Sequence, residues 1–179
     1  MGAGRRIRNR DGITLVEIAI AVAILGILAA LAITSFGEMR EKYAIETETK
    51  NFYAAMMEAR GRASQRSRHH FVRITSGGFA VFEDTGPSPD GDGAYVSGAD
   101  NQVINETTKH AIAAFLLPAS ATGDNVIFDR RGISNVTGYV RFANTPGSSA
   151  NPDYNCVTIR ETRLRTGKMN ATDNNCIEK

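Results

Sequence analysis

A single carboxylate, Glu17, lies near the start of an otherwise apolar stretch, residues 13–36. Every other residue in that stretch is apolar, a glycine or a small hydroxyl residue. A helix of this length would measure roughly 36 Å and would cross a hydrocarbon core of about 30 Å. Because a charge inside such a helix costs roughly 2.5–3.5 kcal/mol, Glu17 is expected to have a partner.

Cleavage of the chain between Gly12 and Ile13 would create that partner. The cut would place a new ammonium on Ile13, four residues before Glu17 and on the same side of a helix. In a helical assembly the ammonium of an adjacent subunit could equally pair with this carboxylate. A cut between Gly12 and Ile13 would therefore give each of the two charges the partner that it lacks.

Four arginines precede the apolar stretch, at positions 5, 6, 8 and 10. The positive-inside rule then puts the N-terminus in the cytoplasm and residue 37 onward outside. An ordinary secretory signal peptide cut after Ala32 is the alternative. Two features argue against it: the apolar run exceeds the usual 7–15 residues, and Glu17 would have no purpose in a removed segment.

The two cysteines, Cys156 and Cys176, lie near the end of the chain. Two thiols without CxxC spacing do not make a four-ligand zinc site. In an oxidising compartment they predict a disulfide, which would add on the order of 3 kcal/mol in the chain-entropy model.

The 179 residues suit one domain with an appendage. We expect a leader at 1–12, a transmembrane assembly helix at 13–36, an amphipathic extension at 37–68 and a β-rich head at 69–179. The formal charge is +2, but the leader holds four arginines against one aspartate, so the remainder carries −1. Without the leader, no global positive field steers the protein toward nucleic acid or anionic lipid.

One helical stripe is predicted to pack the extension against the head. Glu41 and Glu48 lie at its edge, and its members recur at positions that share one face of a 3.6-residue helix: Ile45, Phe52, Met56, Ala59 and Ala63.

From His69 onward the pattern favours strands. Two runs around Gly77-Gly78 predict a hairpin, and residues 85–101 predict an exposed loop. The fold class is therefore α+β, a long N-terminal helix packed against a mostly antiparallel head, with later strands expected at 109–115, 125–128, 138–143, 155–161 and 164–169.

The N-terminal motif, Gly12 followed by "ITLVEIAIAVAILGILAALAI", resembles the class III leader of type IV pilins and type II secretion pseudopilins. The resemblance implies a type IV pilin-like fold. It also implies that a prepilin peptidase cuts after Gly12 and methylates the amine of Ile13, while Glu17 guides assembly. The implied partners are other pilin or pseudopilin subunits, this peptidase, the inner membrane and its assembly platform.

The second half resembles the GspH/FimT-type minor pilins and pseudopilins through Phe128, Gly132, Ile159, Arg163 and Arg165. This implies a minor subunit at or near a filament tip, with a major pilin as the alternative. Pilus and secretion pseudopilus both remain open. The expected location is the bacterial inner membrane, crossed once with the head periplasmic, and then a periplasmic or extracellular filament.

DNA is a further possible partner, because some FimT-like pilins bind it through their basic C-terminal signature. Arg160, Arg163, Arg165 and Lys168 occupy that region here. On a strand, Arg163 and Arg165 share one face and would reach adjacent phosphates in a salt-sensitive, sequence-independent way. The alternative is a solvated strand face.

No metal, cofactor or enzymatic activity is expected. His69 and His70 would point to opposite faces of a strand. Asp84, Asp90 and Asp92 lack the frame of a calcium loop. The chain has no GxSxG, HExxH or glycine-rich phosphate loop.

Overall fold

The structure, a computed structural model, describes residues 14–87, 91–117, 125–170 and 175–179; the side chains of 31–35, 116–117 and 125 lie outside the description. The chain divides into two compact units, Met1–Gly37 and Glu38–Lys179. Helix α1 (Leu15–Arg66) begins in the first unit and ends in the second.

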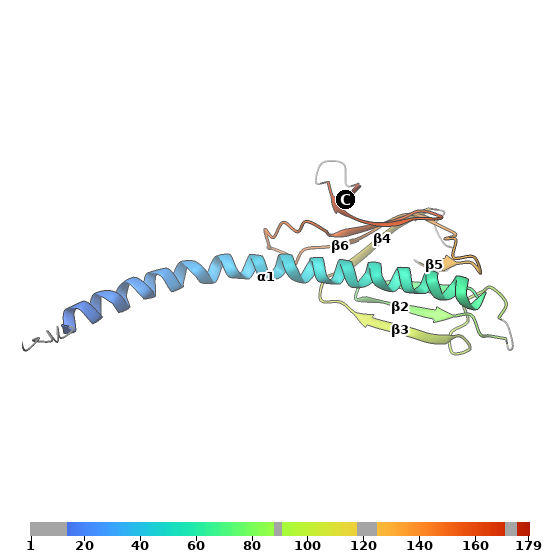
Figure 1. Ribbon diagram of the computed structural model, residues 1–179, viewed down its shortest axis with the longest axis horizontal. Helices are drawn as coiled ribbons and strands as arrows, with labels where there is room; N and C mark the ends of the chain where they lie inside the picture. The colour runs from blue at the N-terminus through green and yellow to red at the C-terminus, as the bar shows by residue number, and fades with distance from the viewer. Residues whose placement is uncertain (1–13, 88–90, 118–124, 171–174) are drawn as a thin grey trace, which may run out of the picture. The chain divides into compact units, whose positions relative to one another are not determined.

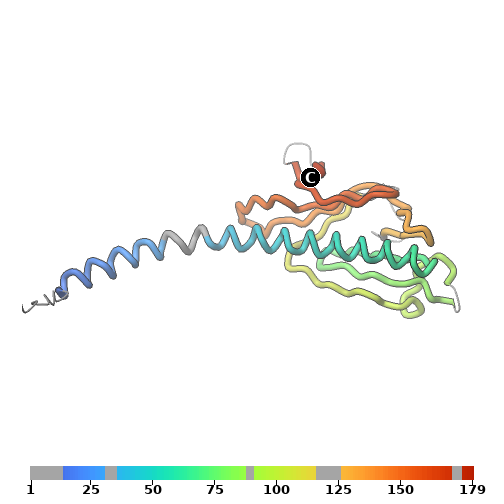
Figure 2. Tube along the Cα trace, viewed as in Figure 1, coloured from blue at the N-terminus to red at the C-terminus, as the bar shows by residue number. Residues whose placement is uncertain are grey.

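Within the second unit, α1 lies between two antiparallel sheets (Figure 1). The sheet on one side has the order β3-β2-β1-β5, and the sheet on the other side has the order β4-β6-β7-β8-β9 (Figure 2). The first contains β1 (His70–Thr75), β2 (Gly78–Glu83), β3 (Asn101–Thr107) and β5 (Asn125–Phe128). The second contains β4 (Ile112–Leu117), β6 (Thr137–Phe142), β7 (Cys156–Ile159), β8 (Leu164–Met169) and β9 (Cys176–Glu178).

The core forms around the predicted stripe of α1, whose five members are all fully buried. Phe52 joins the two sheets: its ring lies 5.0 Å from that of Phe79 on β2 and 6.0 Å from that of Phe142 on β6. Both ring pairs are edge-on, an arrangement that contributes about 0.5–1.5 kcal/mol beyond the buried area. The helix is thus the shared core element of both sheets.

The turn after β5 explains one of the family motifs. Phe128 is buried in the core, and Gly132 closes the turn by donating its N–H to the carbonyl of Asp129 at 2.8 Å. Gly132 has φ +76°, and a Cβ there would meet the backbone carbonyl oxygen of Arg60 at 3.0 Å. Both the backbone conformation and the close approach of α1 require glycine.

The predicted disulfide joins Cys156 on β7 to Cys176 on β9. These strands are not neighbours, because β8 lies between them. Gly167 of β8 faces Cys156 in the ladder, and a Cβ on it would meet the Cys176 sulfur at 2.9 Å and the Ile177 carbonyl oxygen at 2.4 Å. The missing side chain therefore lets the disulfide cross over the middle strand.

The described residues between β2 and β3 form a mostly exposed loop, as the sequence predicts, but two of its side chains hold it to the first sheet. Tyr95 packs on the rings of Phe71 and Phe82, with centroids 6.0 and 4.8 Å away. Asp100 is buried and accepts hydrogen bonds from three backbone N–H groups, those of Thr85, Gly86 and Val96. An aromatic anchor and a buried carboxylate thus tie this segment to the first sheet.

Most predicted strands are confirmed, and two are missed. The β1–β2 hairpin, β5 and β8 form where predicted, while β4, β6 and β7 differ from their predicted bounds by up to three residues. The missed strands, β3 and β9, are edge strands of their sheets; β3 is mostly polar and β9 has only three residues. Such strands lack the apolar alternation on which sequence reasoning depends.

Replacement of Phe52 by alanine is expected to lower the free energy of unfolding by about 3–5 kcal/mol, because a ring that fills the space between both sheets is removed. Urea unfolding of the full chain in detergent micelles measures this. Met57→Ala is the matched control on the same helix, since Met57 is 42% exposed; its effect should stay within about 0.5 kcal/mol. Equal effects of the two substitutions would contradict the role given to Phe52.

Candidate functional site

The N-terminal site is described from Thr14 onward, so the predicted processing residues Gly12 and Ile13 lie outside the described residues. Glu17 falls in the first turn of α1, where the helix dipole favours a negative charge. Its side chain is exposed. The carboxylate is therefore free to reach a partner outside its own helix turn.

Thr14 gives the Thr-Leu-Val-Glu motif a second role that the sequence analysis missed. The N–H of Glu17 donates to the hydroxyl oxygen of Thr14 at 3.2 Å. Thr14 is thus the N-cap and Glu17 the third helical residue, the S/T-x-x-E spacing of a capping box. That spacing was readable in the sequence, and it indicates where α1 begins.

The apolar side chains that follow Glu17 are uncovered within their unit. Every large apolar residue from Leu15 to Leu28 is more than half exposed. Among the residues that the structure describes, no helix is long and apolar enough to cross a membrane.

Three arginines of the basic C-terminal region share the outer face of the second sheet. Arg160 and Arg163 exchange backbone hydrogen bonds across the β7–β8 turn, and Arg165 lies opposite Thr158. Ile159 precedes Arg160 on one side of the turn, and Leu164 lies between Arg163 and Arg165 on the other. Both belong to the core and face α1. Successive strand residues point to opposite faces, so Arg160, Arg163 and Arg165 project away from the helix.

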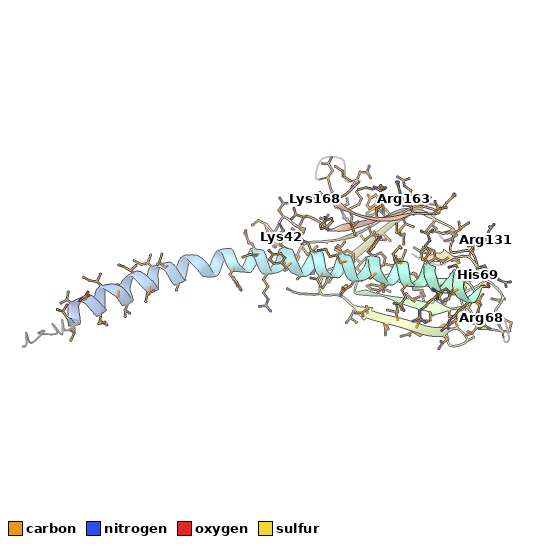
Figure 3. The ribbon with its side chains drawn as sticks, viewed as in Figure 1. Lys42, Arg68, His69, Arg131, Arg163 and Lys168 are labelled. Atoms are coloured by element: carbon orange, nitrogen blue, oxygen red, sulfur yellow. A yellow bond between two sulfur atoms is a disulfide. The ribbon has the colours of Figure 1, made fainter. Side chains whose placement is uncertain are left out.

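Two of these arginines already have an acidic partner. Glu178 on β9 accepts a hydrogen bond from Arg163 at 3.0 Å and lies 3.7 Å from Arg165. Lys168 stands at an odd spacing from Arg165 and so belongs to the other face of β8. Figure 3 labels Arg163 and Lys168 toward opposite ends of this strand. Lys42 and, more weakly, Lys168 lower the pKa of Asp153. The predicted set of four basic residues is thus three arginines on one face and one lysine on the other.

A buried histidine links the second sheet to α1, and the sequence analysis did not single it out. The His110 side chain is fully buried. Its Nε2 lies 3.0 Å from an oxygen of Glu41, and its Nδ1 lies 2.8 Å from an oxygen of Glu48. Both contacts are hydrogen bonds from the ring only when both nitrogens carry protons. The signal for this site was the pair of glutamates at the edge of the apolar stripe.

Backbone donors complete the same cluster. Glu48 also accepts from the N–H groups of Lys109 and His110, at 2.9 and 3.3 Å, and Glu41 accepts from the N–H of Thr145 at 2.9 Å. The hydrogen bonds of Thr145, with those of His110, hold the pKa of Glu41 at about 2, below its ordinary value of 4.5, although burial opposes this. The cluster therefore fixes the start of β4 and the loop after β6 onto the helix.

The other acidic and histidine candidates serve the fold. His70 is buried, and burial lowers its pKa. The Nδ1 of His69 lies 3.4 Å from buried Asp84, which also accepts from the N–H of Gly93 at 2.8 Å. Asp92 caps its own turn through the N–H of Ala94, and Asp90 lies outside the described residues. In the described part of the chain no three acidic, histidine or cysteine side chains gather around a common metal position.

Two known family models match this chain. The prokaryotic N-terminal methylation motif matches residues 7–33, and the family of the type II transport protein GspH matches residues 48–162. The second match spans most of the chain. The chain belongs to the GspH family. The predicted pilin-like fold and the GspH-type resemblance are confirmed.

Among solved structures, this GspH-family chain is similar to the minor pseudopilin EpsH from the type 2 secretion system of Vibrio cholerae. The sequences are 15% identical, the match covers 70% of this chain and 97% of EpsH, and the TM-score is 0.47. A search of the curated proteins finds no match to this sequence.

The Glu41 cluster predicts a pH dependence of stability in acid. Because the folded pKa is about 2 against an ordinary 4.5, the contribution of Glu41 is complete above pH 4.5 and is lost as the pH falls toward 2. Glu41→Gln should therefore destabilise the head at neutral pH, and the difference from the unchanged protein should shrink in acid. Urea unfolding across this range measures both.

Glu58→Gln is the control for the cluster. Glu58 forms an exposed ion pair with Arg62 on the same helix, and such pairs contribute about 0–1 kcal/mol. A Glu41→Gln difference that stayed constant from neutral pH down to pH 2 would contradict the role given to Glu41.

Proposed function

We propose that this chain is a minor pseudopilin of a type II secretion system and is assembled into a filament through the first half of α1. One observation carries the proposal: each large apolar side chain from Leu15 to Leu28 is more than half exposed, directly after a helix cap that includes Glu17. An apolar surface of this size needs lipid or neighbouring helices around it. An apolar surface that is covered by neighbouring helices suits a structural subunit without enzymatic activity.

Glu17 sets the position of each helix relative to its neighbour in that assembly. In the described chain α1 begins at Leu15, after the Thr14 cap. A cleaved chain would carry its ammonium on Ile13, the residue before the cap in the sequence. We infer that Glu17 pairs with the ammonium of a neighbouring subunit, because charges of opposite sign attract strongly in apolar surroundings.

Before assembly, residues 13–36 would anchor the chain in the inner membrane, with the arginine-rich leader in the cytoplasm and the head in the periplasm. The prepilin peptidase would remove residues 1–12 and methylate Ile13, and the assembly platform would then extract the subunit. The disulfide between Cys156 and Cys176 suits the oxidising periplasm. A type IV pilus subunit, minor or major, is the alternative for the same chemistry.

Charge removal at Glu17 tests this proposal while the helix cap is kept. Glu17→Gln preserves a side chain suited to the third helical position but removes the negative charge, so filament incorporation should fall at least about tenfold, the equivalent of about 1.4 kcal/mol. Quantitative immunoblotting of sheared filaments measures it. Thr14→Ser keeps the cap and should assemble normally.

The processing step is tested separately in the same cells. Mass spectrometry should find a mature N-terminus at methylated Ile13, and Gly12→Ala should leave the full-length chain in the membrane. Normal filament incorporation of Glu17→Gln, or a mature chain that begins at Ile33, would overturn the proposal.

A second candidate function, DNA binding, is supported by the three arginines that share the outer face of the second sheet. Glu178 opposes it by pairing with Arg163 and Arg165. Any contact with DNA would be made to phosphates, with no base readout, and would weaken as salt rises.

If that surface binds DNA, Glu178→Gln should strengthen binding. Replacing both Arg163 and Arg165 by alanine should weaken binding and reduce the magnitude of the negative slope of log K against log salt by about 2. Lys168→Ala is the matched control, because Lys168 lies on the other face of β8. Fluorescence anisotropy of the full chain in detergent with duplex DNA measures these effects. Equal binding by all three variants would remove the surface from consideration.

A further inference from the structure

The edge of the first sheet is formed by β3, which pairs only with β2 among the residues that the structure describes (Figure 1). At seven residues it is the longest of the four edge strands; β4, β5 and β9 have six, four and three. Unpaired backbone N–H and C=O groups along an edge are a template for another strand.

Some of the usual protections of an edge strand are absent from β3. Lysine and proline, which prevent pairing, are absent from Asn101–Thr107. The ladder with β2 shifts register between Val81 and Phe82, which leaves Val103 as an extra residue, and pairing is regular again from Ile104 to Thr107. That regular half of β3 remains able to accept a further strand.

A hollow of about 350 Å³ lies on the helix side of this edge. Its walls come from α1 (Asn51, Ala54, Ala55 and Glu58) and from Ile104 and Glu106 of β3. Ile104 and Glu106 lie opposite Val81 and Phe79 in the ladder, which face the core, so both project toward the helix. Small residues on the helix leave space for side chains of an added strand.

A second hollow, of about 220 Å³, lies on the opposite face of the same edge. Its lining includes Arg73, Ala80 and Phe82 with Asn105 and Thr107 of β3. Alternate residues of a strand point to opposite faces of a sheet. A strand added to β3 would therefore direct one set of side chains toward each hollow.

The charges indicate what that strand carries. Glu58 is paired with Arg62, but Glu106 has no ion-pair partner in the part of the chain that the structure describes. A cross-strand partner of opposite charge is favoured by roughly 0.2–1 kcal/mol. The β3 strand of a second copy offers no lysine or arginine for this position, so a different polypeptide suits the site better.

We propose that β3 is a docking edge for an extended segment of a partner polypeptide, which adds a fifth strand to the first sheet and places a basic residue against Glu106. The partner's remaining side chains on that face are small and apolar, over Ala54 and Ile104. This surface lies on the head and does not depend on the processing of the leader.

Hydrogen exchange of the full chain in detergent micelles tests this with a defined probe, the capped peptide Thr-Lys-Thr-Val-Thr-Val-Thr, in which the lysine and both valines share one face. At a peptide concentration about ten times the dissociation constant, alternate amides of Ile104–Thr107 should exchange about tenfold more slowly. The matched control peptide has proline in place of the central valine and should give no protection, since proline cannot complete the ladder.

Two variants separate the edge from nonspecific binding. Glu106→Lys should weaken binding of the lysine peptide at least about fivefold and should strengthen binding of a peptide with glutamate in place of the lysine, because the cross-strand charges are reversed. Ala54→Trp fills the helix-side hollow and should also block binding, whereas Met57→Trp, which lies outside that hollow, should not.

Three results would overturn the proposal. Exchange at β3 that does not change with either peptide would do so. So would equal binding of the lysine peptide by Glu106→Lys and the unchanged protein. Protection of these amides without peptide that disappears on dilution would assign the edge to a second copy instead of a partner.

Discussion

The second unit depends on one helical stripe that is buried from two sides. Ile45, Phe52, Met56, Ala59 and Ala63 are fully buried, and Phe52 touches an aromatic ring from each sheet. Neither sheet has another described helix on which to bury its apolar face. The charged cluster of Glu41, Glu48 and His110 lies along the same helix and sets the position of the second sheet. Removing the stripe would leave both sheets without a common core.

The sequence predicted the elements whose apolar residues recur at a regular spacing. A helix stripe at intervals of four, seven and eleven residues has a clear physical signature, and so does a glycine hairpin between two apolar strands. The edge strands β3 and β9 have no such signature, because hydrogen bonds to the neighbouring strand, and not a local apolar pattern, hold them in place. The His110 cluster was missed for a related reason: Glu41 and His110 are far apart in sequence, and nothing local links them.

The candidate sites likewise divide into features that the sequence predicts and features that only the structure shows. Glu17 was found because a carboxylate in an apolar run is costly, whereas its place in a helix cap was missed although the Thr-x-x-Glu spacing stands in the sequence. The arginines of the C-terminal hairpin were found through the resemblance to the basic signature of FimT-type pilins. Only the structure brings Glu178 beside two of them and separates Lys168 onto the other face. Charge patterns in a sequence identify surfaces well, but they do not reveal which charges are already neutralised across a sheet.

The position of the shared helix at the start of the chain has a consequence for how the head forms. The stripe is translated first, while Phe142, Val157 and Ile159, which complete its covering, arrive roughly a hundred residues later. Contacts so distant in sequence close slowly, and apolar surface left uncovered meanwhile is prone to aggregation. The last strands thus complete the covering of the stripe, and a chain cut before β7 would keep only β4 and β6 of the second sheet.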